Sequence, residues 1–128
     1  MELSEPNLSN SDLPDSDLKK SEMNDVLELD LYDEDRKALI NDSNDQIEKV
    51  AKALSSATRR LILLQIQSSN EGMDVSNIAS ILNMTEANIS AQIKKLQEAG
   101  LIYCDYCSGN HGVRKISNLK FDKIIINF

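Results

Sequence analysis

The sequence predicts an α+β fold that is mainly α. Apolar residues recur at helical spacing in successive segments between Ser43 and Gly100. After Gly100 the apolar period becomes that of strands, with a glycine-rich cluster between two short runs. A chain of 128 residues has room for one domain.

Charge is divided unevenly along the chain. Residues 1–43 hold four basic and thirteen acidic side chains, a net charge of −9. Residues 44–128 hold ten basic and eight acidic ones, a net charge of +2. This asymmetry predicts a separate acidic arm and not an acidic domain. We therefore expect an acidic, partly disordered tail over residues 1–43 and a folded domain over residues 44–128.

The tail itself has two parts. Residues 1–22 are rich in Ser, Asp, Asn and Glu and contain Pro6 and Pro14, so they bury too little apolar surface to become ordered. Residues 25–32 instead alternate leucines with polar residues, as a half-buried strand does. Its partner would be the β-like run over residues 121–128. A linker in which the alternation is accidental is the alternative.

Two helices are expected at the start of the domain. Ser43 and Gln46 have the spacing of a capping box, in which each side chain binds a free backbone amide of the first turn. A second helix, from about Ser56 to Gln67, is so apolar that we expect it to be the most buried element. Its Arg59 and Arg60 are interpreted as a solvated pair, with a phosphate contact by one of them as the alternative. The first helix has an apolar stripe at Ile47, Val50, Ala51 and Leu54.

The stretch from Met73 to Gly100 has the pattern of two short helices joined by a tight turn. Asp74 is a suitable N-cap for the first of them, and Asn83 tolerates the left-handed backbone that a sharp turn requires. Thr85 would cap the second helix, predicted over residues 86–99, and Gly100 would end it. This pattern predicts a helix-turn-helix, with a purely structural helical hairpin as the alternative. The expected buried positions are Val75, Ile78, Ala79, Leu82, Ile89, Ile93 and Leu96.

A β-hairpin is expected directly after this motif. Residues 101–106 and 113–116 have strand composition, and residues 108–112 form a turn cluster. A hairpin in this position is a wing, so the fold class becomes a winged helix-turn-helix with a β-hairpin wing. Arg114 and Lys115 follow the glycine-rich tip and suit a phosphate backbone. An ordinary solvated hairpin is the alternative.

The segments AKALSSATRRLILLQI and MDVSNIASILNMTEANISAQIKKLQEAGLI, with Gly109 and Gly112 in the hairpin, resemble the ArsR-type winged-helix regulators, and archaeal-type members most. The resemblance covers about residues 44–126. It implies a cytoplasmic, usually dimeric repressor whose second motif helix, the recognition helix, enters the major groove of double-stranded DNA. It also implies that Thr85 caps this helix. Asn88, Ser90, Ala91 and Gln92 then lie where such regulators approach bases.

Helical geometry gives a similar face. With Ile89, Ile93 and Leu96 inward, the opposite side of the helix carries Ala87, Asn88, Ala91, Lys94 and Lys95, flanked by Ser90 and Gln92. Alanine suits a thymine methyl group, Asn and Gln amides suit adenine, and lysines suit phosphates. The candidate DNA-binding residues are Thr85, Ala87, Asn88, Ser90, Ala91, Gln92, Lys94, Lys95, His111, Arg114 and Lys115.

Metal binding and catalysis find little support in the sequence. Cys104 and Cys107 are three residues apart, which places them on opposite faces of a straight strand, and His111 would be only a third ligand. The ArsR-type metal sensors often carry a Cys-x-Cys at the start of the first motif helix, where this chain has Met73-Asp74-Val75-Ser76. We expect ordinary strand cysteines, with redox sensitivity as a further option. No cofactor and no enzymatic activity are expected.

Two alternatives to a DNA-binding regulator remain open. The recognition helix could serve as a docking surface for another protein, or the acidic tail could cover the basic face as an autoinhibitory DNA mimic. A core of about 80 residues buries only about 60% of its unfolded surface, so we expect a homodimer, formed through the terminal segments or the first helix. The sequence has no run of about 18 apolar residues, so it predicts no membrane span.

Overall fold

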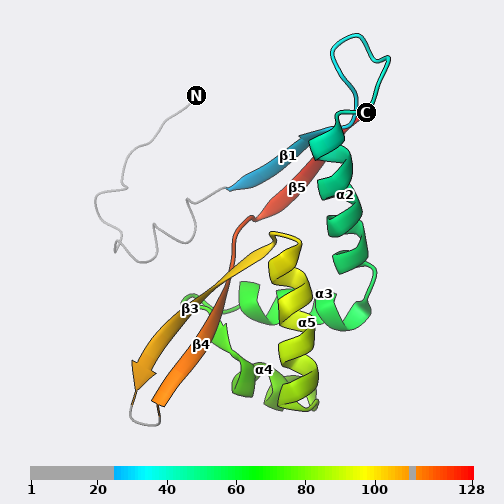
Figure 1. Ribbon diagram of the computed structural model, residues 1–128. Coiled ribbons are helices and arrows are strands. Elements are labelled where there is room, and N and C mark those ends of the chain that lie inside the picture. Colours follow the sequence, from blue (N-terminus) through cyan, green and yellow to red (C-terminus); the bar gives the residue numbers. More distant parts are fainter. Residues whose placement is uncertain (1–24, 110–111) are drawn as a thin grey trace, which may run out of the picture.

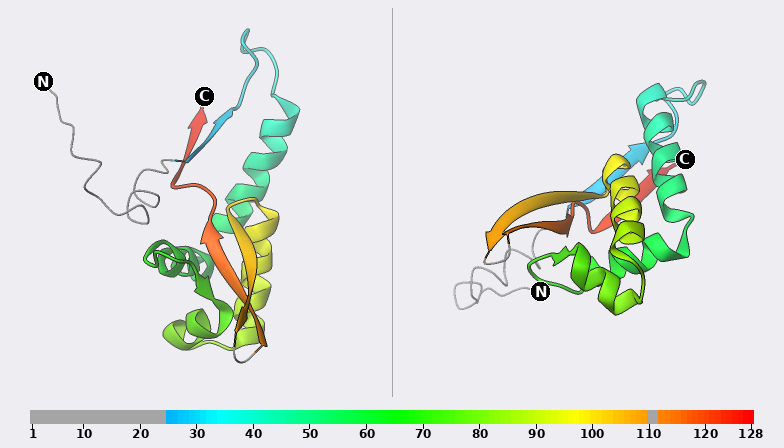
Figure 2. Two further views of the ribbon diagram at one scale, coloured as in Figure 1. Left: turned by 90° about the vertical axis from the view of Figure 1, so that its left-hand side faces the viewer. Right: turned by 60° about the horizontal axis from the view of Figure 1, so that its bottom comes forward.

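The computed structural model describes residues 25–109 and 112–128. Its helices form one cluster, from which a long hairpin extends at one end, and a pair of strands lies beside the first helix at the other end (Figures 1 and 2). In chain order the elements are β1 (Val26–Asp30), α2 (Asn41–Leu54), α3 (Ala57–Gln67), β2 (Met73–Asp74), α4 (Val75–Leu82), α5 (Glu86–Glu98), β3 (Ile102–Gly109), β4 (Gly112–Leu119) and β5 (Lys123–Asn127). None of the described helices is long and apolar enough to cross a membrane. The predicted tail segment over residues 1–22 lies outside the described residues.

Helix α5 occupies the centre of the core. Its Ile89, Ile93 and Leu96 have no exposed surface, which confirms the buried face expected from the sequence. They pack with Ile62 and Ile66 of α3, among others. Burying one such side chain contributes about 1.5–3 kcal/mol to folding, so the core fixes the rotation of α5 about its axis.

The expectation that α3 is the most buried element is wrong. Ile62 and Ile66, one helical turn apart, are fully buried, but Leu61 and Leu64 are 44% and 51% exposed. The helix presents a single face to the core, so apolar residues on its other face meet solvent.

Helix α2 begins at Asn41, earlier than the capping-box spacing indicates. Ile40 occupies the N-cap position and makes no side-chain cap, so the expected capping box of Ser43 and Gln46 does not form. The preceding loop decides this start, because the Ile40 backbone amide donates to the Leu31 carbonyl at 3.1 Å. Ser43 is therefore already inside the first helical turn.

Strands β3 and β4 form the predicted hairpin, which is longer than expected. They pair antiparallel from Ile102 with Leu119 to Gly109 with Gly112, so both ends of the predicted 108–112 turn belong to strands. The short β2 adds to β4 as a third strand, giving the order β2-β4-β3. Because β2 leads directly into α4, the sheet is joined to the start of the helix-turn-helix.

Strands β1 and β5 pair in parallel and form what we call the terminal ribbon, Val26–Asp30 with Lys123–Asn127. This confirms the predicted partnership of the two segments and excludes the accidental-linker interpretation. Leu29 is 5% exposed, and Leu27 packs against the core cluster. The ribbon thus brings residues from the two ends of the described chain together beside α2 (Figure 1).

Candidate nucleic-acid interface

The helix-turn-helix is built by local caps that match the predictions. Asp74 Oδ1 accepts a hydrogen bond from the Asn77 backbone amide at 2.8 Å and caps α4. Asn83 ends that helix with left-handed φ and ψ angles of 56° and 50°. Thr85 Oγ1 accepts from the Asn88 amide at 3.1 Å and caps α5. Because each cap satisfies a free amide of a first turn, the start of α5 is well defined.

The side of α5 away from the core is exposed, as the helical spacing predicted. Gln92 is half-buried beside this face. The exposed face consists of small side chains together with amides and lysines. That these side chains contact DNA stays a prediction. The exposed residues are Thr85, Ala87, Asn88, Ser90, Ala91, Lys94 and Lys95.

A chain of polar contacts runs across this face. Arg59 Nη1 donates to Gln92 Oε1 at 2.7 Å, and Gln92 Nε2 donates to Asn88 Oδ1 at 3.0 Å. Asn88 Nδ2 lies 3.8 Å from Met84 Sδ, a weak acceptor. The two amides that the sequence assigned to base contacts are therefore already oriented by the protein.

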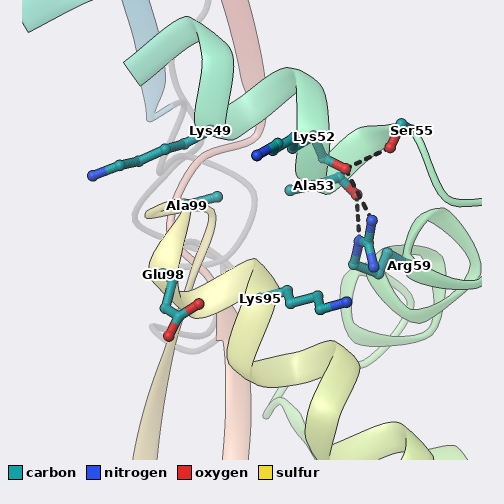
Figure 3. A pocket seen from close by; sticks show the side chains of 8 residues that line it. All are labelled: Lys49, Lys52, Ala53, Ser55, Arg59, Lys95, Glu98 and Ala99. Atoms are coloured by element: carbon teal, nitrogen blue, oxygen red, sulfur yellow. Dashed lines mark hydrogen bonds between the residues drawn. The ribbon is translucent and has the colours of Figure 1, made fainter. Parts of the chain in front are cut away.

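Arg59 does not behave as a solvated surface residue, and that interpretation is wrong for it. Its Nε donates to the Ala53 carbonyl at 2.8 Å and its Nη2 to the Lys52 carbonyl at 2.9 Å (Figure 3). Arg60 Nη1 similarly donates to the Leu54 carbonyl. The sequence indicates this binding of the α2 carbonyls, because the two arginines come shortly after a helix whose last carbonyls have no hydrogen-bond donor within that helix.

A cleft of about 740 Å³ separates the end of α2 from the C-terminal half of α5 (Figure 3). Lys49 and Lys52 of α2 line one side of it, and Lys95 and Glu98 of α5 the other. The described part of the chain supplies no ion pair to these lysines. Sequence reasoning missed Lys49 and Lys52, although their spacing places them on one side of the helix. The lining residues are Lys49, Lys52, Ala53, Ser55, Arg59, Lys95, Glu98 and Ala99.

The wing carries its cations differently from the expectation. Arg114 is engaged with Asp74, and its side chain is 53% exposed. Lys115 is half-buried on β4, where it pairs in register with Tyr106. His111 lies outside the described residues. Arg114 is therefore held by an ion pair within the protein, whereas Lys115 has no ion pair among the described residues. Of these two wing cations, Lys115 is the one more available to a phosphate.

The two cysteines lie on β3, one half-buried and one exposed. Cys104 Sγ is 3.6 Å from Ser117 Oγ and 3.6 Å from Gln97 Oε1. Cys107 pairs in register with Arg114. Over residues 25–109 and 112–128, no group of three or more His, Cys, Asp or Glu side chains is placed to hold a metal ion.

Parts of the chain are similar to known transcriptional regulators. The family model described as "bacterial regulatory protein, arsR family" matches residues 56–103. A crystal structure of fragment 1–100 of a possible transcriptional regulatory protein from Mycobacterium bovis is 28% identical, with a TM-score of 0.50 over 59% of this chain and 75% of that one. A solution structure from the same organism is described as a homodimeric winged helix-turn-helix DNA-binding domain of a possible ArsR-family transcriptional regulator. It is 26% identical, with a TM-score of 0.54 over 68% of this chain and 72% of that one. The comparison with curated proteins found no match.

Proposed function

We propose that this chain is a DNA-binding transcriptional regulator of the ArsR type, with a winged helix-turn-helix domain, and that it acts as a homodimeric, cytoplasmic repressor. The observation that carries the proposal is the outer face of α5. It is exposed, it has no bulky apolar residue, and it lies between a capped helix start and the wing. The repressor role and the compartment are those that the resemblance to ArsR-type regulators implies.

In the proposed complex α5 enters the major groove. The groove admits an α-helix, and Ala87 and Ala91 allow close approach and contact with a thymine methyl group. Asn88 and Gln92 present amides to base edges, and Ser90 flanks them. A good bidentate contact of this kind contributes about 1–3 kcal/mol of discrimination against the wrong base.

Cations around α5 would bind the phosphate backbone. Lys94 and Lys95 are exposed on the helix, and Lys115 lies on the wing. Glu86 and Glu98 on the same helix oppose them, since both would repel phosphates. We therefore expect a modest affinity for each domain, and two domains acting together would supply the rest.

Dimerisation is proposed through the terminal ribbon. The ribbon has only two strands, and two isolated strands are marginally stable in water. Its Val26 and Ile125 are 38% and 39% exposed, and the adjoining Phe128 is 75% exposed. Pairing two ribbons would cover this apolar surface. The homodimeric relative from Mycobacterium bovis supports a dimer as the assembly.

Selection of bound sequences from random double-stranded DNA tests the proposal. We expect enrichment of a near-palindromic site, because a dimer places two recognition helices on two half-sites. Asn88→Ala should reduce this enrichment, whereas Lys123→Ala, on the terminal ribbon, should not. If no sequence is enriched even at low salt, the domain is instead a protein-docking winged helix.

The same assay tests the acidic tail as a DNA mimic. Removal of residues 1–24 leaves β1 intact and deletes six acidic and two basic side chains, a net charge of −4 out of the −9 of residues 1–43. If the tail covers the basic face, the shortened chain binds DNA more tightly and with a steeper salt dependence. Unchanged affinity at every salt concentration would reject the mimic.

A further inference from the structure

We propose that the cleft between α2 and α5 is a binding site for a small polyanion, such as a compound that carries two or more phosphate groups. The inference goes beyond the proposed DNA binding and does not depend on it. The cleft has a volume of about 740 Å³, which lies within the range of small-molecule sites, roughly 300–1,000 Å³.

Small side chains leave the space between the two helices. Ala53, near the end of α2, and Ala99, directly after α5, both line the cleft and are 3% and 5% exposed. Alanine has only one carbon beyond the backbone, so a longer side chain at either position would fill part of the cleft. The space is therefore a consequence of the residues at these two positions.

The charged side chains around the cleft are mostly cations. Four of the eight lining residues are Lys or Arg, and only Glu98 is acidic. Lys49 and Lys52 are three residues apart on α2 and therefore share one side of that helix. Among the residues that the structure describes, no ion pair involves these lysines. Cations without carboxylate partners around a concave surface suit an anion of more than one charge.

The two cations on the other side of the cleft lie close to each other. Arg59 donates to Gln92, and Lys95 follows Gln92 by three residues, which places both on one side of α5. In Figure 3 the ammonium group of Lys95 is directed toward Arg59. Two like charges directed toward each other are stabilised by an anion between them.

Arg59 also offsets the one backbone feature that would repel an anion. The C-terminal end of a helix carries a partial negative charge, and here the carbonyls of Lys52 and Ala53 end α2 beside the cleft. Arg59 donates to both of them, at 2.9 and 2.8 Å (Figure 3). With its contact to Gln92, it uses three of its five N–H donors, which leaves two for an anion.

The position of the cleft argues against a DNA phosphate as its occupant. Figure 1 shows the start of α5 and the far end of the β3–β4 hairpin at one end of the molecule. The cleft lies farther from that end, where α2 meets the C-terminal half of α5. A duplex held by the start of α5 and by the wing would therefore leave Lys49 and Lys52 to a small molecule.

Isothermal titration calorimetry of the full chain with inorganic pyrophosphate tests the site. The chain has a net charge of −7, so its overall charge does not attract anions. Lys52→Ala removes a cation of the cleft, and Lys94→Ala is its matched control, because Lys94 is exposed on α5 but does not line the cleft. Glu98→Gln removes the carboxylate of the cleft, with Glu86→Gln, at the other end of α5, as its control.

We expect pyrophosphate to bind the unchanged protein. Lys52→Ala should lower the affinity for pyrophosphate about fivefold, the effect of one close pair of unit charges in water, and Glu98→Gln should raise it by a similar factor. Lys94→Ala and Glu86→Gln change the net charge equally but should leave the affinity nearly unchanged. All four side chains are exposed, and thermal unfolding establishes that each variant is folded.

Three results would overturn the inference. These are no binding of pyrophosphate at low salt, an equal loss of affinity in Lys52→Ala and Lys94→Ala, and equal affinities of Glu98→Gln and Glu86→Gln. A loss of DNA affinity in Lys52→Ala as large as its loss of pyrophosphate affinity would instead assign the cleft to a DNA phosphate. If the protein selects no DNA sequence, the proposed function fails and the pyrophosphate result stands by itself.

Discussion

Arg114 on the wing and Asp74 at the start of α4 form an ion pair, with Nη2 and Oδ2 2.7 Å apart and a second contact of 2.8 Å from Nε. The Asp74 side chain is only 12% exposed, and its other oxygen caps α4 through the Asn77 amide. One carboxylate thus joins the wing to the helix-turn-helix. The two surfaces proposed to contact DNA are held in a fixed relative orientation.

This double role predicts different effects for two substitutions of Asp74. Asp74→Asn keeps an oxygen for the cap but removes the charge that binds Arg114. Asp74→Ala removes both, and removal of an N-cap costs about 0.5–2 kcal/mol. Urea unfolding should therefore find Asp74→Ala less stable than Asp74→Asn by about 1 kcal/mol. Equal stability would mean that the cap contributes nothing.

Two glycines with left-handed backbone should differ in their tolerance of alanine. A Cβ at Gly72, where φ is +82°, would lie 2.7 Å from the Ser117 carbonyl oxygen and 2.8 Å from Ile116 Cγ2. At Gly100, where φ is +79°, no atom lies within 4 Å of the added Cβ. Gly100→Ala should cost only the backbone strain, about 1–2 kcal/mol, and Gly72→Ala clearly more. Thermal unfolding of both variants measures this, and a similar destabilisation of each would contradict the close packing at Gly72.

Phosphate binding by α5 predicts a change in salt dependence. Lys94→Ala and Lys95→Ala should each make the plot of log affinity against log salt concentration shallower, by about 0.9 for each phosphate that the lysine neutralises. Lys123→Ala, on the terminal ribbon, is the control and should leave the slope unchanged. Fluorescence anisotropy with the selected site, over a salt series, provides the slopes. If either α5 variant binds more weakly with an unaltered slope, its lysine does not bind a phosphate.

If the dimer forms through the terminal ribbon, a lysine introduced into exposed apolar surface should disrupt the dimer only when it lies on that ribbon. Ile125→Lys, on the terminal ribbon, should give a monomer at micromolar concentration. Leu61→Lys, on α3, should remain dimeric, although Leu61 is similarly exposed at 44% against 39% for Ile125. Sedimentation velocity distinguishes the two species. If the unchanged protein is a monomer, there is no dimer. If only Leu61→Lys disrupts the dimer, the interface lies on α3 and not on the terminal ribbon.

Sequence reasoning succeeded where the deciding chemistry is local. The caps at Asp74 and Thr85 and the turn at Asn83 depend on residues within one helical turn, and the spacing of Ile89 and Ile93 sets the inward face of α5. The pairing of residues 25–32 with residues 121–128 was also foreseeable, because two alternating segments needed partners. Its parallel direction was not, since that depends on the path of the whole chain between them.

The failures have a common physical origin in interactions between distant segments. Arg59 and Gln92 are 33 residues apart, so no local pattern connects them. Ser43 and Gln46 have the spacing of a capping box, but the hydrogen bond from the Ile40 backbone amide to the Leu31 carbonyl makes the helix begin earlier. The candidate site was thus predicted as a set of exposed residues. The orientation of its amides required the fold.

Sequence-specific DNA binding is best tested by the affinity of the protein for its selected site, compared with a scrambled site of equal length over a salt series. We predict that the selected site binds roughly 10³-fold or more tightly at physiological salt, and that both affinities fall as salt rises. Equal affinity for the two sites at every salt concentration, or no binding at low salt with and without residues 1–24, would contradict sequence-specific DNA binding by this domain.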